Sequence, residues 1–210
     1  MTLIDSPVAN VANIARALRT VGASLDVTRE PEAIARSRKI VLPGVGSFTA
    51  AMRWLDENGI ARAIRDAVSN GSALMGICVG HQLLFDVSYE MGVTSGLGLV
   101  RGEVRLFEGT LPIPQIGWNS VWINDVPGAV DRDEGGPASP LFDGIANGAS
   151  FYFVNSYAAS DVPHEVARAD YGGSFTAAVQ NGRVFGVQFH PEKSSHAGLR
   201  VLRNFVENVA

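Results

Sequence analysis

The sequence predicts an α/β fold with three layers, in which helices cover both faces of a mostly parallel central sheet. Short apolar runs alternate in the first half of the chain with segments whose apolar residues recur at helical spacing. Two of these runs end in glycine-containing turns, at 43–46 and at 76–80. Sites in such sheets form at the carboxyl ends of the strands, so we expect both turns to border one site.

Each element of the first half has its own signal. Apolar residues at helical spacing after Asn10, followed by Gly22, predict a helix, and Pro31 opens a short helix at its first position. The third strand is expected to stop at Pro43. In chain order, we expect strands at 2–4, 24–28, 39–42 and leading up to Cys78, and helices at 10–21, 31–36, 48–55 and 60–68.

The second half contains more glycine and several short β-type runs. We expect strands at 151–154, 175–179 and 184–189, and a closing helix over 196–209 with one apolar side. The polar stretch 125–140 carries several Gly and Pro residues and is predicted to be an exposed loop. Since no repeat or linker divides the chain, one domain over 1–210 fits best.

Composition narrows the classes of function. Of 210 residues, 46% are hydrophobic and 18% charged, which is ordinary for a globular protein with a substantial core. The net charge of −4 gives no sign of the basic surface that binding to nucleic acid or to an anionic membrane requires. No apolar run is long enough to span a bilayer. The single cysteine excludes an internal disulfide and indicates a reducing, cytoplasmic setting. Because the histidines lack ligand spacing, we expect no metal, and we expect no cofactor.

The stretch around the only cysteine organises the chain. An apolar run reaches Gly76, presents Cys78, and passes through Gly80 into a predicted helix. Gly-x-Cys-x-Gly has the form of a nucleophile elbow, with sulfur in place of the serine oxygen. Flanking glycines are needed because so sharp a strand-to-helix turn leaves no room for side chains. The alternative is a buried structural cysteine at a strand end.

A cysteine nucleophile needs a base and a group that orients the base. Of four histidines, His81 follows the cysteine closely and is expected to point away, while His164 lies in a polar loop. His190 ends a predicted strand and precedes Glu192 by two residues, which can direct both side chains toward one site. Taken alone, His-Pro-Glu is more often a plain strand-to-helix turn.

The two motifs together resemble the class I (triad) glutamine amidotransferases, whose mobile oxyanion loop is matched by Pro-Gly-Val-Gly at 43–46. More specific segments, 117–119, 151–157, 175–179 and 186–194, are similar to the glutaminase subunits of imidazole glycerol phosphate synthase. The resemblance covers nearly the whole chain in the family's order. It implies a three-layer α/β/α glutamine amidotransferase-like fold, with a mostly parallel central sheet and an additional antiparallel β region.

The resemblance also implies roles for individual residues. Cys78 would attack the carboxamide of glutamine to give a thioester and ammonia, His190 would transfer the protons, and Glu192 would orient the imidazole. The oxyanion would be held by backbone N–H groups of Val79, Val45 and Gly46. The amino-acid part of glutamine would be held by Gln82, Glu90, Ser156 and Tyr157. Without the resemblance, Glu90 would be interpreted as a solvated loop charge.

Ammonia would pass to a (β/α)₈-barrel cyclase subunit in a heterodimer, where it enters histidine biosynthesis. The positions that would face this partner are Asn10, Trp118, Tyr152 and Lys193. Each also has an ordinary interpretation, with Lys193 as a solvated charge and the two aromatic residues as core. An exposed Trp/Tyr patch beside a site would suit a protein interface.

The chain departs from the family at several positions. Both glycines and the tyrosine of the family's opening motif are replaced in 5–11, where Pro7 changes the turn. His81 stands where methionine is frequent, and Asn155 where histidine is frequent. Three alternatives remain open: a glutaminase of another synthase (for pyridoxal phosphate, anthranilate or an amidated sugar), a free-standing hydrolase of γ-glutamyl compounds, and a silent docking subunit.

Overall fold

The central sheet has seven strands in the order β11-β12-β13-β4-β3-β1-β2. The computed structural model describes residues 1–7, 10–123 and 139–209. The five strands from β13 to β2 are parallel, whereas β12 and β11 are antiparallel to their neighbours. The strands are β1 (Thr2–Ile4), β2 (Asp26–Thr28), β3 (Lys39–Gly44), β4 (Ala73–Cys78), β11 (Glu165–Asp170), β12 (Ser174–Asn181) and β13 (Val184–Val187).

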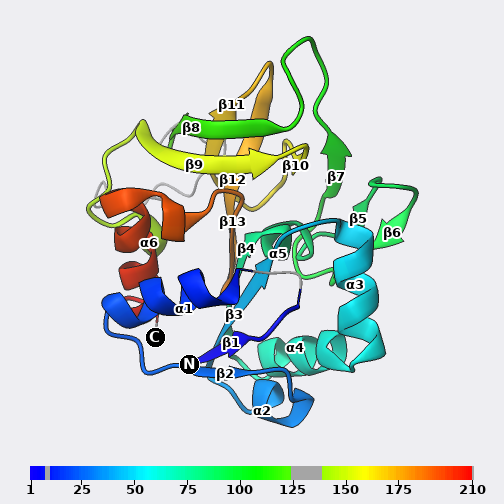
Figure 1. The fold of residues 1–210 in the computed structure, drawn as a ribbon, viewed down its shortest axis with the longest axis vertical. Helices are drawn as coiled ribbons and strands as arrows, with labels where there is room; N and C mark the ends of the chain where they lie inside the picture. The colour runs from blue at the N-terminus through cyan, green and yellow to red at the C-terminus, as the bar shows by residue number, and fades with distance from the viewer. Residues whose placement is uncertain (8–9, 124–138, 210) are drawn as a thin grey trace.

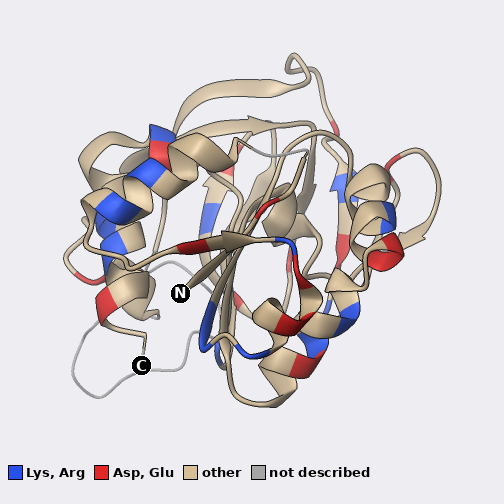
Figure 2. Ribbon diagram, turned by 60° about the horizontal axis from the view of Figure 1, so that its bottom comes forward, with Lys and Arg blue, Asp and Glu red and all other residues tan. Residues whose placement is uncertain are grey.

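Helices cover both faces of this sheet (Figure 1), which confirms the predicted three-layer α/β class. One face carries α1 (Val11–Thr20) and α6 (Ser195–Glu207), and the other carries α2 (Pro31–Ala35), α3 (Phe48–Glu57) and α4 (Ile60–Ser69). Basic and acidic residues are interspersed along the helices (Figure 2), while β1, β4 and β13 contain neither. Such uncharged strands are typical of a sheet that is buried on both faces.

Local signals explain where the helices begin and end. The side chain of Asn10 caps α1 by accepting a hydrogen bond from Asn13 N, and Gly22 follows this helix with φ +93°. The apolar side of α1, including Ile14 and Leu18, is buried against the sheet and α6. Within the described residues, no helix has both the length and the apolar character needed to cross a membrane.

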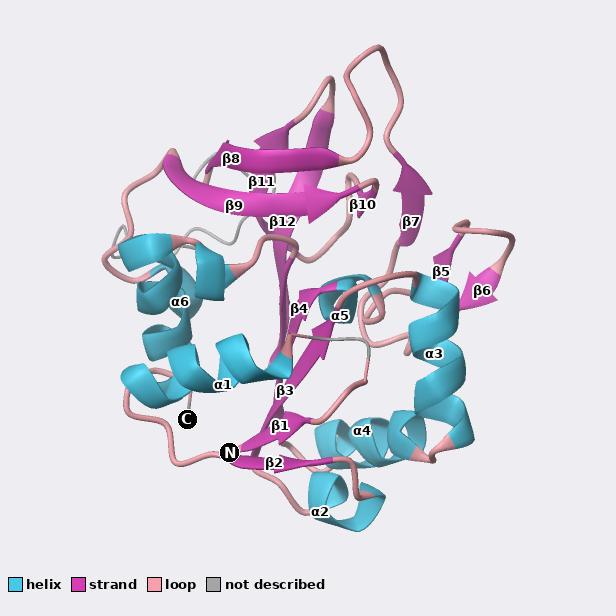
Figure 3. Cartoon of the chain, in the orientation of Figure 1, coloured by secondary structure: helices cyan, strands magenta, loops and turns pink. Residues whose placement is uncertain are grey.

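An additional β region lies beyond the carboxyl ends of the parallel strands (Figure 3). A small sheet has the order β10-β7-β5-β6, and an antiparallel ribbon is formed by β8 and β9. These elements are β5 (Val87–Ser88), β6 (Thr94–Ser95), β7 (Glu103–Leu106), β8 (Gln115–Val121), β9 (Ala149–Asn155) and β10 (Tyr157–Ala159). The antiparallel region agrees with the family resemblance, although β5, β8, β10 and β11 were not predicted as strands.

The sequence prediction needs correction at the ends of two strands: the strand expected at 184–189 ends at Val187, and the third strand runs further than expected. Strand β3 does not stop at Pro43 but continues to Gly44, with Pro43 opposite Ile77 of β4. Because β1 pairs with β3 only at Ile40 and Val41, the proline lies where β3 has a single neighbouring strand and its missing N–H is tolerated. The exposed loop expected at 125–140 falls mostly outside the described residues, and its described end, Ser139, is buried.

Three glycines allow backbones to meet at the end of β4. A Cβ on Gly80 would overlap the carbonyl oxygen of Leu42, and one on Gly76 would overlap the carbonyl of Gly80. A Cβ on Gly44 would lie 2.7 Å from Gly80 N, which is closer than such atoms approach in folded proteins. The turn after Cys78 is therefore pressed directly against β3 and β4, as expected for an elbow.

We predict that Gly80→Ala destabilises the protein by about 3 kcal/mol, because the new methyl group meets rigid backbone. Gly173→Ala is the matched control, since no atom of the described residues lies within 4 Å of its Cβ position, and it should change stability by less than about 0.5 kcal/mol. Urea unfolding of both variants measures the difference. Equal stability of the two variants would show that the elbow can relax around a side chain.

Candidate active site

Cys78 ends β4 in a strained backbone conformation. Its φ of 55° and ψ of −112° place a non-glycine residue at positive φ, which costs about 1–3 kcal/mol and is concentrated at functional sites. The helix that follows, α5 (Val79–Gln82), has only four residues, so its dipole contributes less than that of a long helix. Its first N–H, from Val79, remains a potential donor beside the sulfur.

His190 and Glu192 form a buried pair directly after β13. His190 Nδ1 lies 3.0 Å from Glu192 Oε1, with the two side chains 5% and 1% exposed. The backbone of His190 is tied to β9, because its N–H donates to the carbonyl of Tyr152 at 2.8 Å and its carbonyl accepts from Ser194 Oγ at 2.6 Å. Ser194 Oγ in turn accepts from Tyr152 N at 3.0 Å. These bonds fix where the imidazole emerges.

The imidazole of His190 favours its charged form. Burial lowers the pKa of His190, but hydrogen bonds and electrostatic attraction to Cys78 and Glu192 outweigh burial and raise this pKa to about 10. A histidine that stays protonated at neutral pH beside a thiol favours ionisation of the sulfur. The predicted cysteine, histidine and carboxylate are thus brought together in the order that nucleophilic catalysis requires.

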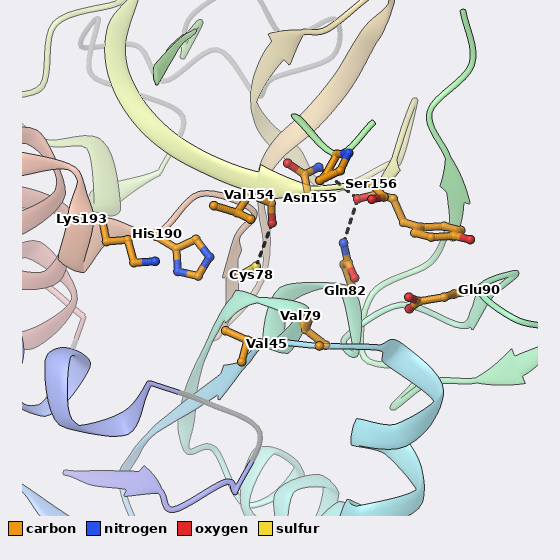
Figure 4. A pocket seen from close by; sticks show the side chains of 13 residues that line it. Val45, Cys78, Val79, Gln82, Glu90, Val154, Asn155, Ser156, His190 and Lys193 are labelled. Atoms are coloured by element: carbon orange, nitrogen blue, oxygen red, sulfur yellow. Dashed lines mark hydrogen bonds between the residues drawn. The ribbon is translucent and has the colours of Figure 1, made fainter. Parts of the chain in front are cut away.

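A cavity of about 250 Å³ opens at the sulfur (Figure 4). Its wall includes the sulfur of Cys78 and the imidazole of His190, while Glu192 lies behind the imidazole. The other predicted site residues on the wall are Val45, Gly46, Val79, Gln82, Glu90, Ser156, Tyr157 and Lys193. The cavity therefore collects residues from both halves of the chain at the carboxyl ends of β3 and β4.

Gln82 and Glu90 are held in defined positions. Gln82 Nε2 donates to the carbonyl of Tyr157 at 2.8 Å and to Gln188 Oε1 at 3.0 Å, so both of its hydrogens are used. Glu90 Oε2 accepts from Phe48 N at 2.6 Å, at the first residue of α3. Glu90 is therefore an anchored carboxylate at the cavity wall and not a freely solvated loop charge.

Four residues at the site were not predicted. Pro114, Val154 and Asn155 line the cavity, and the fully buried Gln188 lies 4.0 Å from the sulfur through its Nε2. The sequence contains a signal for Gln188. In an extended segment, side chains two residues apart point to the same side, so Gln188 is expected on the same side as His190. Val154 and Asn155 depend on how β9 approaches the elbow, and Pro114 depends on the segment that leads into β8; the sequence pattern specifies neither.

Three of the four predicted partner residues form a patch beside the cavity. Trp118 and Tyr152 face each other across β8 and β9, with ring centroids 6.0 Å apart, and Lys193 Nζ lies 5.7 Å from the centre of the Tyr152 ring. Trp118 is 56% exposed and is therefore not a core residue. Asn10 lies apart from this patch as the exposed cap of α1.

The family model for glutamine amidotransferase class-I matches residues 2–209. The chain belongs to this family. It is 43% identical, over 99% of its length and 93% of the relative's, to imidazole glycerol phosphate synthase subunit HisH of Herpetosiphon aurantiacus. It is 41% identical, over 100% of its length and 95% of the relative's, to the protein of the same name from Moorella thermoacetica.

Solved structures agree with this membership at the level of the fold. A crystal structure of a glutamine amidotransferase superposes with a TM-score of 0.73 at 19% identity, covering 98% of this chain and 97% of that one. A chain of PurLQS from Thermotoga maritima gives 0.69 at 20% identity, covering 100% and 98%. At these identities the likeness concerns the fold alone.

His81 differs from His190 although both lie near the elbow. His81 is fully buried, its ring meets that of Phe85 edge-on at 5.1 Å, and neither ring nitrogen has a hydrogen-bond partner among the described residues. Burial lowers the pKa of His81 to about 3. His81 does not line the cavity, in line with the prediction that it points away. Among the described residues, no group of three or more His, Cys, Asp or Glu could hold a metal ion.

The lowered pKa of His81 predicts acid sensitivity. The unfolded chain binds a proton on this residue below about pH 6.5, whereas the folded chain does not until about pH 3. The free energy of unfolding therefore falls by about 1.4 kcal/mol per pH unit as the pH decreases through this window. His81→Met removes the titrating group while keeping an apolar side chain, so this part of the slope should disappear.

Urea unfolding at a series of pH values between 3 and 7 tests the prediction, with His196→Met as the control because His196 is exposed. The control should keep the wild-type slope. If His81→Met keeps it as well, the buried imidazole is not the source of the acid sensitivity.

Proposed function

We propose that the chain is the glutaminase subunit of an imidazole glycerol phosphate synthase. It would hydrolyse glutamine to glutamate and ammonia and pass the ammonia to a cyclase subunit, as one domain of a cytoplasmic heterodimer. The observation that carries the proposal is the convergence of Cys78, His190 and Glu192 on one cavity, in a chain about 40% identical over its whole length to relatives named as this subunit.

In the proposed reaction, the sulfur of Cys78 attacks the side-chain carbonyl carbon of glutamine. The developing oxyanion is held by backbone N–H groups of Val79 and of the 45–46 segment. His190 donates its proton to the nitrogen as the C–N bond breaks, which leaves a thioester and releases ammonia. His190 then takes a proton from a water molecule that attacks the thioester, and glutamate departs. Glu192 keeps the imidazole oriented throughout.

The polarity of the wall supports binding of an amino acid. Both hydrogens of Gln82 Nε2 are used internally, so Gln82 can offer only its Oε1 as an acceptor, and Glu90 is also an acceptor. These two groups suit the α-ammonium of glutamine. Backbone N–H groups at Ser156 and Tyr157 suit its α-carboxylate.

The patch of Trp118, Tyr152 and Lys193 supports a partner close to the site. Lys193 belongs both to the cavity wall and to the patch, so a subunit that covers the patch would also cover the mouth through which ammonia leaves. A glutaminase of another synthase would share the triad but present a different patch. A free-standing hydrolase would leave a large aromatic side chain exposed beside its site without use.

The first prediction of this proposal concerns activity. Glutamate release should be low for the chain alone and strongly stimulated by the cyclase subunit with its ribonucleotide ligand. Cys78→Ala should lower the stimulated rate by about 10³-fold or more, and Glu192→Gln by about 10²-fold or more. Full activity without a partner would favour a free hydrolase, whereas silence in both conditions would reject the proposed synthase.

A second prediction concerns docking. Trp118→Ala should weaken binding of the cyclase subunit by about tenfold or more, because exposed tryptophans are frequent hot spots. Val27→Ala is the control, since Val27 is exposed on β2, at the edge of the sheet away from the ribbon. Calorimetric titration of each variant with the cyclase subunit measures the affinity. Equal affinities would exclude the patch from the interface.

A further inference from the structure

Gln188 is a fully buried polar side chain between two residues of the site. It follows β13, and its backbone N–H donates to the carbonyl of Ala177 at 2.9 Å. Its Oε1 lies 3.0 Å from Gln82 Nε2, and its Nε2 lies 4.0 Å from Cys78 Sγ. Gln188 does not line the cavity, so it reaches the sulfur from the buried side.

The direction of these hydrogen bonds is fixed by a backbone carbonyl. The oxygen of Tyr157 can only accept, and it accepts from Gln82 Nε2 at 2.8 Å and from Asn155 Nδ2 at 3.0 Å. The nitrogen of Gln82 must therefore face Tyr157. The atom of Gln188 nearest this nitrogen must be its oxygen, since two amide nitrogens would present donor to donor. Consequently the nitrogen of Gln188 faces the sulfur.

Besides the amide nitrogen of Gln188, a backbone carbonyl oxygen with the opposite partial charge lies near the sulfur. The carbonyl oxygen of Val154 lies 3.8 Å from Cys78 Sγ and can only accept (Figure 4), so it favours the protonated thiol. The amide nitrogen of Gln188 can only donate, so it favours the ionised thiolate. The two neutral groups therefore act against each other on the same atom. Removing Gln188 would leave the His190 imidazole, held by Glu192, as the side chain that still opposes the Val154 carbonyl.

We propose that Gln188 is a positioning residue of the glutaminase, which donates a hydrogen bond to Cys78 and holds its sulfur in the reactive, ionised form. Its amide is oriented by a relay that runs from the Tyr157 carbonyl through Gln82 to Gln188. The inference rests on the proposed function only in assuming that the sulfur is the nucleophile. Since Gln82 also belongs to the cavity wall, the relay connects the substrate-binding wall to the nucleophile.

Alkylation by iodoacetamide tests the proposal, because the chain has a single cysteine and the thiolate is the reacting species. The rate is measured against pH for the wild type and for Gln188→Met, which keeps the length of the side chain but cannot donate. The midpoint of the profile should move up by about one pH unit, so that alkylation below the midpoint slows about tenfold. Gln188→Glu, which places an anion beside the sulfur, should shift the midpoint at least as far.

The hydrogen bond between Gln82 and Gln188 is tested by a separate variant. Gln82→Met leaves Gln188 in place but removes the bond that orients it, so the midpoint should shift in the same direction by a smaller amount. Asn204→Met is the control, since Asn204 is a buried amide that bonds the carbonyls of Leu141 and Asp143. It should leave the midpoint unchanged. Urea unfolding of each variant identifies those that are folded.

The outcomes separate this proposal from the proposed function. An unchanged midpoint in folded Gln188→Met or Gln188→Glu overturns the role of Gln188, whatever the glutaminase activity. A shift of equal size in Asn204→Met also overturns it, because general loosening would then explain the effect. Alkylation needs no glutamine, so a shifted midpoint in a protein that releases no glutamate would support the Gln188 contact while rejecting the glutaminase.

Discussion

Close approach of three backbone segments at the end of β4 is the constraint on which the rest of the structure depends. Gly44, Gly76 and Gly80 leave no space for a Cβ, and the turn between them holds Cys78 at positive φ. Because β3 and β4 are parallel neighbours, the same contact places the 44–46 segment beside Val79. The nucleophile and Val79, one of the potential oxyanion donors, are thus positioned by the packing of the sheet, whereas Val45 and Gly46 follow the end of β3.

The two histidines near the elbow show how partners decide the behaviour of a buried imidazole. The imidazole of His81 has no hydrogen-bond partner in the part of the chain that the structure describes, and burial lowers its pKa to about 3, whereas Cys78 and Glu192 raise the pKa of His190 to about 10. The contribution of His81 to stability is lost as the pH falls below about 6.5. The contribution of His190 is complete below that pH and is lost as the pH rises toward 10. One imidazole is therefore suited to filling the core and the other to holding a proton.

Much of this architecture could be predicted from local patterns. The parallel core follows from alternating apolar runs, and the elbow from glycines two residues on either side of Cys78, because both signals are short in range. The family and its fold were predicted from motif order and are confirmed by the comparisons. The continuation of β3 through Pro43 is possible because β1 does not pair with β3 at that position. Strand β8 shows too little alternation of apolar and polar residues to be recognised from the sequence. Such features are decided by tertiary context.

The place of Gln188 illustrates the same limit at the level of a single atom. Its spacing from His190 could be read from the chain, but the polarity of its amide could not, because that polarity depends on a carbonyl in a different strand. Tyr157 belongs to β10 of the small sheet in the antiparallel region, and its carbonyl meets the elbow helix through Gln82. A backbone carbonyl oxygen can only accept a hydrogen bond, which fixes the orientation of the Gln82 amide. Gln82 in turn fixes the orientation of the Gln188 amide, whose nitrogen faces the sulfur. The antiparallel region thus does more than close the cavity: it determines which end of a buried amide the nucleophile meets.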